Sequence, residues 1–195
     1  MNTQVKSSNG ITLVPIETRL LANRKILIKG EINDESAFEF VEKMMLLTEE
    51  DSKKTIDVLI NSPGGQIDAG LLMYDVIQGS IAPIRMFCLG EAFSMAAVLF
   101  SCGRYGRYIL PHSKLMLHEP LIGNNMGGNA SSIKSISDNL IEARNKINKI
   151  LSKHTGKTEQ EIEIATSFDH YFSSKESVEF GLADEIIEFN KIIEE

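Results

Sequence analysis

Short apolar runs alternate with amphipathic segments through the first two-thirds of the chain. Runs rich in apolar and β-branched residues predict strands at 24–32, 55–62, 83–90, 108–110 and 114–119. Apolar residues at helical spacing predict helices over 33–50, which carries Phe38, Val41 and Met45 at that spacing, over 66–78 and over about 94–101. The residues before 24 read as turn-like. Strands that alternate with helices predict an α/β fold with a largely parallel sheet, in one domain over residues 1–195.

One long amphipathic helix is predicted over about 129–154. Its apolar positions are Ile133, Ile136, Leu140, Ile147 and Leu151, and Gly156 supplies a stop. This helix is too long to lie flat on a small sheet, so we expect it to project. Two later segments, 158–161 and 173–176, fit the capping box and predict short helices near 159–167 and 175–180.

Charge and composition exclude several classes of protein. The net charge of −7 disfavours nucleic acid or an anionic membrane as a partner, because both require a basic surface. No apolar run approaches about 18 residues and the start lacks the apolar core of a signal peptide, so a cytoplasmic, unprocessed chain is expected. Cys88 and Cys102 are expected to be buried apolar residues, and no metal or cofactor is implied.

Ser94 lies in the stretch "LGEAFSMAAVLF" (89–100), where a strand ends and an apolar helix begins. Backbone N–H groups at a helix start favour a developing oxyanion, which suits a nucleophile at this place. The stretch lacks the G-x-S-x-G elbow, because Ala96 stands where that motif has glycine. The alternative is that Ser94 merely caps the following helix.

Three further features are ambiguous when each is taken alone. "INSPGG" (60–65) predicts a tight turn whose backbone N–H groups could bind an oxyanion, or an ordinary strand-to-helix turn. Four histidines, His112, His118, His154 and His170, compete as the base, and a histidine at a strand end, such as His118, is more often structural. Asp169 suits either a buried orienting carboxylate or a loop aspartate.

Taken together, four separated blocks resemble the proteolytic subunits of the ATP-dependent Clp protease family. The blocks are "INSPGG", "FSMAAVL", "LMLHEP" and the segment 154–186, in the family's order and at nearly its spacing. The resemblance covers about residues 11–188. It implies a ClpP- and crotonase-like fold of repeated ββα units, with the long helix as a projecting handle.

The resemblance also assigns roles to individual residues. Ser94 matches the family's nucleophile, His118 its base and Asp169 the carboxylate that orients the base. Gly65 and Met95 match the two backbone N–H donors of the oxyanion hole. Gly64 and the glycines of segment 123–130, namely Gly123, Gly127 and Gly128, match the region where substrate peptides lie.

The implied particle is a hollow tetradecamer of two heptameric rings stacked through the handle. The implied activity is endopeptidase action on unfolded proteins, with a Clp AAA+ ATPase as the partner that consumes ATP. The chain departs from the family at Glu91 and Glu119, where glutamine is usual, and at Phe93, where a small residue is usual. The segment 13–21 is shorter than the family's amino-terminal section, which borders the sites where the ATPase docks. This shortening argues against a partnership with the ATPase.

Three alternatives to a Clp-type serine endopeptidase stay open. The chain could be a non-catalytic or partner-activated ring subunit, although it retains all the residues of the triad. A phage-type maturation protease of the same fold would have a dedicated substrate and no unfoldase. A crotonase-type acyl-CoA enzyme would share the core, but no CoA-binding signature is present and that chemistry does not use a Ser-His-Asp set.

Overall fold

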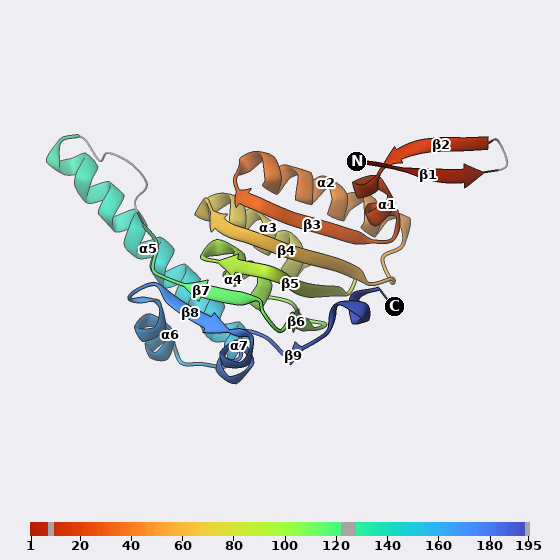
Figure 1. Cartoon of the computed structure of the whole chain (residues 1–195). Helices are drawn as coiled ribbons and strands as arrows, with labels where there is room; N and C mark the ends of the chain where they lie inside the picture. Colours follow the sequence, from red (N-terminus) through yellow and green to blue (C-terminus); the bar gives the residue numbers. More distant parts are fainter. Residues whose placement is uncertain (8–9, 122–127, 194–195) are drawn as a thin grey trace.

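The computed structural model describes residues 1–7, 10–121 and 128–193 of the chain and has an α/β architecture (Figure 1). The main sheet runs in the order β3 (Lys25–Ile32), β4 (Ile56–Gly65), β5 (Ile84–Phe93), β6 (Arg107–Ile109) and β9 (Glu185–Ile186). Every neighbouring pair in this order is parallel. The predicted fold class is therefore confirmed.

Two short strands extend the sheet beside the end of β5. β7 (Lys114–Leu117) pairs with β5 in parallel, and β8 (His170–Ser173) pairs with β7 antiparallel. β8 and β9 were not predicted. Both strands are very short, and no repeating apolar pattern can be recognised over so few residues.

Helices cover one face of the sheet and extend past one end of it. α2 (Asp34–Glu50), α3 (Ile67–Gly79) and α4 (Met95–Ser101) pack on the sheet, and α5 (Ala130–Thr155), α6 (Glu159–Thr166) and α7 (Ser174–Phe180) follow. Asn129 caps α5, and the helix ends at Gly156, the stop that the sequence predicts, which has the left-handed conformation. The amino-terminal half of α5 projects away from the sheet (Figure 1). Capping boxes start α6 and α7, as predicted.

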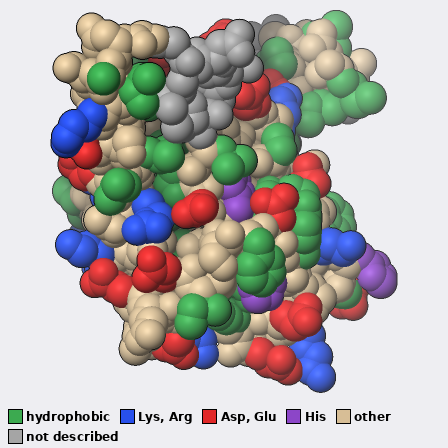
Figure 2. All heavy atoms as spheres, turned by 90° about the vertical axis from the view of Figure 1, so that its left-hand side faces the viewer, with side chains coloured by type: hydrophobic (Ala, Val, Ile, Leu, Met, Phe, Trp, Pro, Cys, Tyr) green, Lys and Arg blue, Asp and Glu red, His purple; other side chains and the backbone are tan. Residues whose placement is uncertain are grey.

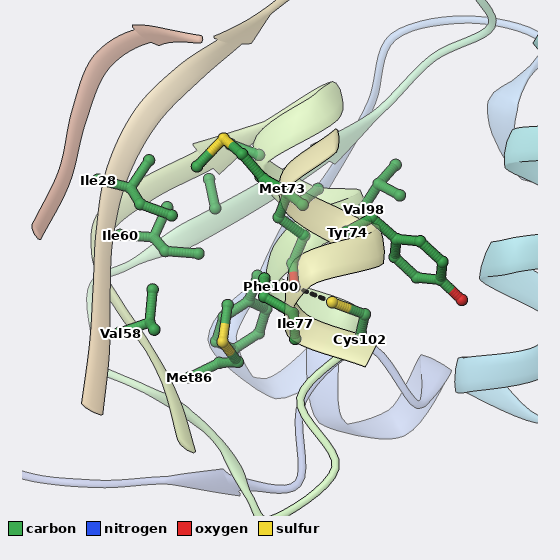
Figure 3. Close-up of a cluster of buried hydrophobic side chains, with 14 of the residues drawn as sticks. Ile28, Val58, Ile60, Met73, Tyr74, Ile77, Met86, Val98, Phe100 and Cys102 are labelled. Carbon is green, nitrogen blue, oxygen red and sulfur yellow. Dashed lines mark hydrogen bonds between the residues drawn. The ribbon is translucent and has the colours of Figure 1, made fainter. Parts of the chain in front are cut away.

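The main core lies between the sheet and these helices. Ile28, Val58, Ile60 and Met86 point from the strands toward α3, which contributes Met73 and Ile77 on this side, and the ring of Tyr74 points away to the other side of the helix (Figure 3). Residues alternate along each strand, so the intervening positions face the opposite side of the sheet. There Leu59 and Phe87 form a smaller cluster with Ile187 and with Ile192 of the 3₁₀ helix Phe189–Ile192.

The amino-terminal segment is regular, and the prediction of turn-like residues before 24 is wrong. β1 (Asn2–Ser7) and β2 (Gly10–Pro15) form an antiparallel hairpin, and α1 (Ile16–Ala22) joins it to β3. The described side chains of β2 are mostly exposed. A hairpin without a buried face lacks the alternating pattern by which a strand is recognised in a sequence.

The "PGG" of residues 63–65 does not form the predicted tight turn. β4 continues through Gly65 and stays paired with β3, where Glu31 faces Gly64 and Ile32 faces Gly65, after a shift of register. Gly64 and Gly65 have φ angles of +92° and +153°. The glycines thus form an irregular strand end, which leads directly into α3.

No helix in the described part of the chain is both long enough and apolar enough to span a bilayer.

Candidate active site

Ser94 lies at the junction of β5 and α4, on the side of the molecule toward which the strands β3, β4 and β5 point (Figure 1). Its backbone N–H donates to the carbonyl of Met116 in β7 at 2.8 Å. Its φ and ψ are 54° and −124°, and over the described residues only Arg24 and Ser94 have a positive φ without being glycine. Such a conformation costs on the order of 1–3 kcal/mol and is typical of functional sites.

The side chain of Ser94 does not cap α4. Ser94 occupies the N-cap position, yet its hydroxyl makes no capping hydrogen bond. Its carbonyl accepts instead from the N–H groups of Ala97 and Val98. The alternative that this serine serves only as a helix cap is therefore wrong, and the half-buried hydroxyl is available for other chemistry.

Two glycines of β4 lie in close contacts at this place, Gly64 against this serine and Gly65 against β3. A Cβ atom added at Gly64 would lie 2.8 Å from Cβ of Ser94 and 2.5 Å from the carbonyl oxygen of Phe93. A Cβ atom added at Gly65 would lie 2.1 Å from the carbonyl oxygen of Ile32. Both contacts are too short for any side chain, so only glycine at 64 lets β4 approach Ser94, and only glycine at 65 lets it approach Ile32 of β3.

Ser94 and His118 line one cavity of about 110 Å³ together with Gly65 and Met95. Met95 is the first residue of α4, where backbone N–H groups have no partner within the helix. The remaining wall is mostly apolar and comes from several elements: Ile67, Val98, Leu117, Pro120, Leu121, Ile147 and Leu151. Four of the five residues assigned to the reaction thus meet at one place.

His118 follows the last residue of β7 and is half-buried. Its Nδ1 atom is buried and has no hydrogen-bond partner. The other histidines stand elsewhere: His112 is exposed, and His170 stacks between Phe168 and Phe172. His118 is the histidine that lines the cavity with Ser94.

His154 is excluded as the base by its surroundings. Its Nε2 lies 3.0 Å from the hydroxyl of Tyr74. Burial, together with the positive charges of Lys153 and Arg107, lowers the pKa of His154 to about 4. Such an imidazole is held neutral inside the structure and does not line the cavity of Ser94.

Asp169 is exposed and does not line the cavity, which agrees with the alternative of a loop aspartate and not with that of a buried carboxylate. Asp169 directly precedes β8, in which His170 pairs with Leu117 of β7. Continuing this antiparallel register by one residue places Asp169 opposite His118. Among the described residues no hydrogen bond joins the two side chains, and Nδ1 of His118 stays unpaired.

The model of the Clp protease family matches residues 8–190. The chain therefore belongs to the Clp protease family. Its members are serine-type peptidases that generally form oligomeric rings with unfoldases, and membership supports a peptidase function for this chain. The parallel sheet with its covering helices agrees with the Clp protease fold.

The two cysteines of the chain offer no competing nucleophile. Cys88 and Cys102 are both fully buried. Burial raises the pKa of each thiol to about 12, so neither is a thiolate at neutral pH. Within the described ranges no group of histidine, cysteine, aspartate or glutamate side chains could hold a metal ion.

The glycines assigned to substrate binding fall at different places. Gly64 contacts the serine, as described above. Gly128 is exposed just before α5. Gly123 and Gly127 lie outside the described residues. The sequence did not predict the apolar wall that Ile147 and Leu151 of α5 give the cavity, although both were recognised as apolar positions of the long helix.

The sequence also did not predict an ion-pair cluster beside this site. Arg144 of α5 lies between Glu119, which follows His118, and Glu163 of α6. Figure 2 views the corresponding side of the molecule and shows histidine side chains among acidic and hydrophobic ones near the centre of the face. The sequence indicated this cluster only through Glu119, which stands where glutamine is usual in the family.

Proposed function

We propose that the chain is a serine endopeptidase in which Ser94 is the nucleophile and His118 the general base. The single observation that carries this proposal is the shared cavity, which places a serine with an unused hydroxyl beside a histidine and two backbone segments suited to an oxyanion. An ordinary connection between a strand and a helix would not require the positive φ of Ser94, which is typical of functional sites.

The reaction would proceed by acyl transfer. His118 would take the proton of the Ser94 hydroxyl as its oxygen attacks the peptide carbonyl, and the N–H groups of Gly65 and Met95 would stabilise the oxyanion. His118 would then give the proton to the leaving amine. A water molecule, activated by His118, would hydrolyse the acyl-enzyme and release Ser94.

Asp169 would complete the triad after a local adjustment. Its place opposite His118 in the continued register of β7 and β8 supports this role. The unpaired Nδ1 of His118 supplies the donor that a carboxylate would accept from. Closing this contact would hold the imidazole in the tautomer whose Nε2 faces the serine.

The apolar wall of the cavity indicates the preferred substrates. Side chains of α3, α4 and α5 surround the space next to Ser94, and none of the wall residues named above is charged. We therefore propose that peptides with an apolar side chain at the cleaved bond are preferred, because burial of that side chain is favourable by about 25 cal/mol per Å².

The proposed particle has two stacked rings joined through α5, and degradation of folded proteins would need a separate AAA+ ATPase. The apolar residues Ile133 and Ile141 on the projecting half of α5 support the first part, because their side chains are 44% and 49% exposed in the single chain. The family's general assembly with unfoldases supports the second.

A fluorophosphonate probe followed by intact-mass measurement tests the proposal. We expect one adduct on the native protein, none on Ser94→Ala, and strongly slowed labelling of His118→Ala, since loss of a triad member typically costs about 10⁴-fold or more. The labelling of Asp169→Asn by the probe should also be slower than that of the native protein. His112→Ala is the matched control, because this exposed histidine lies away from the cavity and should label like the native protein.

Two outcomes would contradict the proposal. Labelling that persists in Ser94→Ala would assign the nucleophile to another residue. A native protein that is folded but does not label would favour the second candidate, a ring subunit aligned only by a partner chain. The unpaired His118 and the exposed Asp169 are the observations that favour that candidate.

A further inference from the structure

Arg144 connects the two segments that carry the proposed base and its orienting carboxylate. Its Nη1 atom lies 3.8 Å from a carboxylate oxygen of Glu119 and 3.7 Å from one of Glu163. Glu119 follows His118 directly. Glu163 belongs to α6, and six residues after it the chain reaches Asp169. One guanidinium of α5 therefore contacts both sides of the His118–Asp169 gap.

The hydrogen bonding of this corner is incomplete. Throughout the described ranges, the buried side-chain nitrogen or oxygen atoms without a partner are Nδ1 of His118, Nε of Arg144 and Nδ1 of His170. All three belong to the corner where the end of β7, the start of β8 and α5 meet. Native proteins pair nearly all such atoms, so these three mark a place where contacts are still to be formed.

The present contacts of Arg144 are ion pairs that are longer than hydrogen bonds. A planar guanidinium with five donors can bind two carboxylates by direct, charge-assisted hydrogen bonds of about 2.7–2.9 Å. Shortening both contacts would draw the segment of Glu119 and the middle of α6 toward each other. Because Glu119 directly follows His118 and α6 leads to Asp169, this movement would act on the two segments that carry the proposed pair.

We infer that Arg144 is a positioning residue for the proposed peptidase reaction, acting through Glu119 and Glu163 to set His118 against Asp169. The inference rests on the proposed function. It assigns Arg144 no contact with substrate, and it connects the placement of α5 with the alignment of the proposed triad.

The test compares Arg144→Met, Arg144→Lys and Glu119→Gln with the native protein. The readouts are the fluorophosphonate labelling rate and, for a short peptide ester, kcat and KM. We expect Arg144→Met to lower the labelling rate and kcat about three- to tenfold with KM within about twofold, because alignment and not binding is lost. Arg144→Lys should recover part of the loss, since it keeps the charge without the planar fork.

A double-mutant cycle separates positioning from a general structural effect. If Arg144 acts through Glu119, then Arg144→Met combined with Glu119→Gln should be no slower than Arg144→Met alone. Lys146→Met is the matched control, because Lys146 is on α5 and pairs only weakly with Glu142, at 4.0 Å, away from this corner. The control should keep the native rates, and urea unfolding should show all variants folded.

The possible failures are distinguishable. If the native protein labels at Ser94 and both Arg144→Met and Glu119→Gln label at the native rate, the inference is overturned. The proposed function is then unaffected. The inference is also overturned if the losses of labelling rate in Arg144→Met and Glu119→Gln are strictly additive in the double variant. It is likewise overturned if Lys146→Met loses as much labelling rate as Arg144→Met. A folded native protein without any labelling overturns the proposed function, and the positioning role with it.

Discussion

At the scale of single residues, the positive φ of Ser94 is the feature that the local sequence predicts least well. In a G-x-S-x-G elbow the glycines that make room for a strained serine are its neighbours in sequence. Here the room is made by Gly64 of β4, 30 positions away, whose missing Cβ would lie 2.8 Å from that of Ser94. A search for the G-x-S-x-G motif therefore does not find this serine, although the backbone at Ser94 turns sharply from β5 into α4.

His154 makes the stability of the fold depend on pH. In the folded chain its pKa is about 4 because of burial, below the ordinary value of about 6.5 that the unfolded chain has. Between pH 6.5 and 4 the unfolded state therefore binds more protons, so this contribution to stability is complete above pH 6.5 and decreases as the pH falls toward 4.

We expect His154→Gln to be less sensitive to this change of pH. Urea unfolding at pH 7.0 and pH 5.0 would show a smaller loss of the free energy of unfolding for His154→Gln than for the native protein. His112→Gln, at an exposed position, serves as the control and should lose as much as the native protein. An equal loss in His154→Gln and the native protein would show that His154 does not carry the effect.

At the scale of secondary-structure elements, α2 shows what a periodic pattern can and cannot predict. Phe38, Val41 and Met45 have helical spacing and the helix is real, but Phe38 and Met45 are 63% and 58% exposed. The buried face consists of Ala37, Phe40, Met44 and Leu47. Both faces of this helix carry apolar residues, so periodicity identifies the helix without deciding which face meets the sheet.

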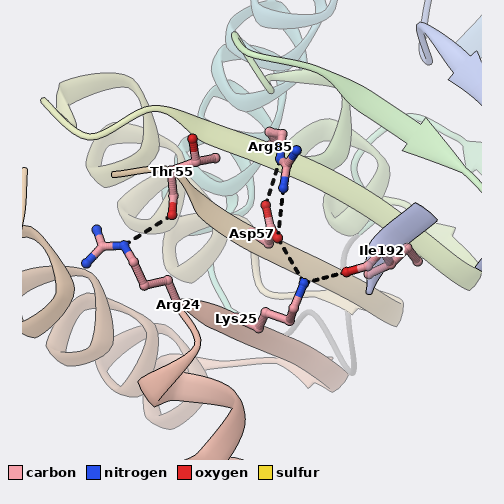
Figure 4. Close-up of polar contacts among 6 residues, drawn as sticks. All are labelled: Arg24, Lys25, Thr55, Asp57, Arg85 and Ile192. Atoms are coloured by element: carbon pink, nitrogen blue, oxygen red, sulfur yellow. Dashed lines mark hydrogen bonds and ion pairs between the residues drawn. The ribbon is translucent and has the colours of Figure 1, made fainter. Parts of the chain in front are cut away.

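A buried carboxylate joins three parallel strands to the carboxyl-terminal segment (Figure 4). Asp57 of β4 accepts from Nε of Arg85 in β5 at 2.8 Å and from Nζ of Lys25 in β3 at 3.1 Å. The same Nζ donates to the carbonyl of Ile192 at 2.6 Å. The side chain of Asp57 is 9% exposed, so its charge depends on these partners.

Replacing Asp57 should strongly destabilise the fold. Asp57→Ala would leave Lys25 and Arg85 close together without a carboxylate, and we expect a loss of about 3 kcal/mol in the free energy of unfolding. The measurement is urea unfolding followed by circular dichroism. Asp75→Ala, at an exposed position of α3, should change stability by less than about 0.5 kcal/mol. A loss below about 1 kcal/mol for Asp57→Ala would contradict this account.

At the scale of the whole molecule, the projecting half of α5 carries apolar side chains that the described part of the chain leaves exposed. Ile133 and Ile141 are about half exposed on this segment, and the carboxyl-terminal half of the same helix buries Ile147 and Leu151 in the core. A helix that stays apolar beyond the body of its own domain indicates contact with another chain. This agrees with the proposed stacking of two rings through α5.

Ile141→Asp should disrupt this stacking. A carboxylate buried in an apolar contact without a partner costs several kcal/mol, so we expect the double ring to separate into single rings. Sedimentation velocity should show about half the native particle mass. Ser135→Asp adds the same charge at an exposed position about 120° away around α5 and should keep the native mass. Equal masses for Ile141→Asp and the native particle would place the contact elsewhere.

The sequence by itself determined the main strands and helices, the parallel sheet, the glycine stop of α5 and the capping boxes of α6 and α7, because these depend on periodicity and alternation along the chain and on residues within one turn of each other. It also placed Ser94 at the junction of a strand and a helix. Only the tertiary structure decided that Gly64 packs on Ser94, that the register of β7 and β8 sets Asp169 opposite His118, and that α5 closes the cavity. These are contacts between segments distant in sequence, and they follow from strand order and register, which no local pattern encodes.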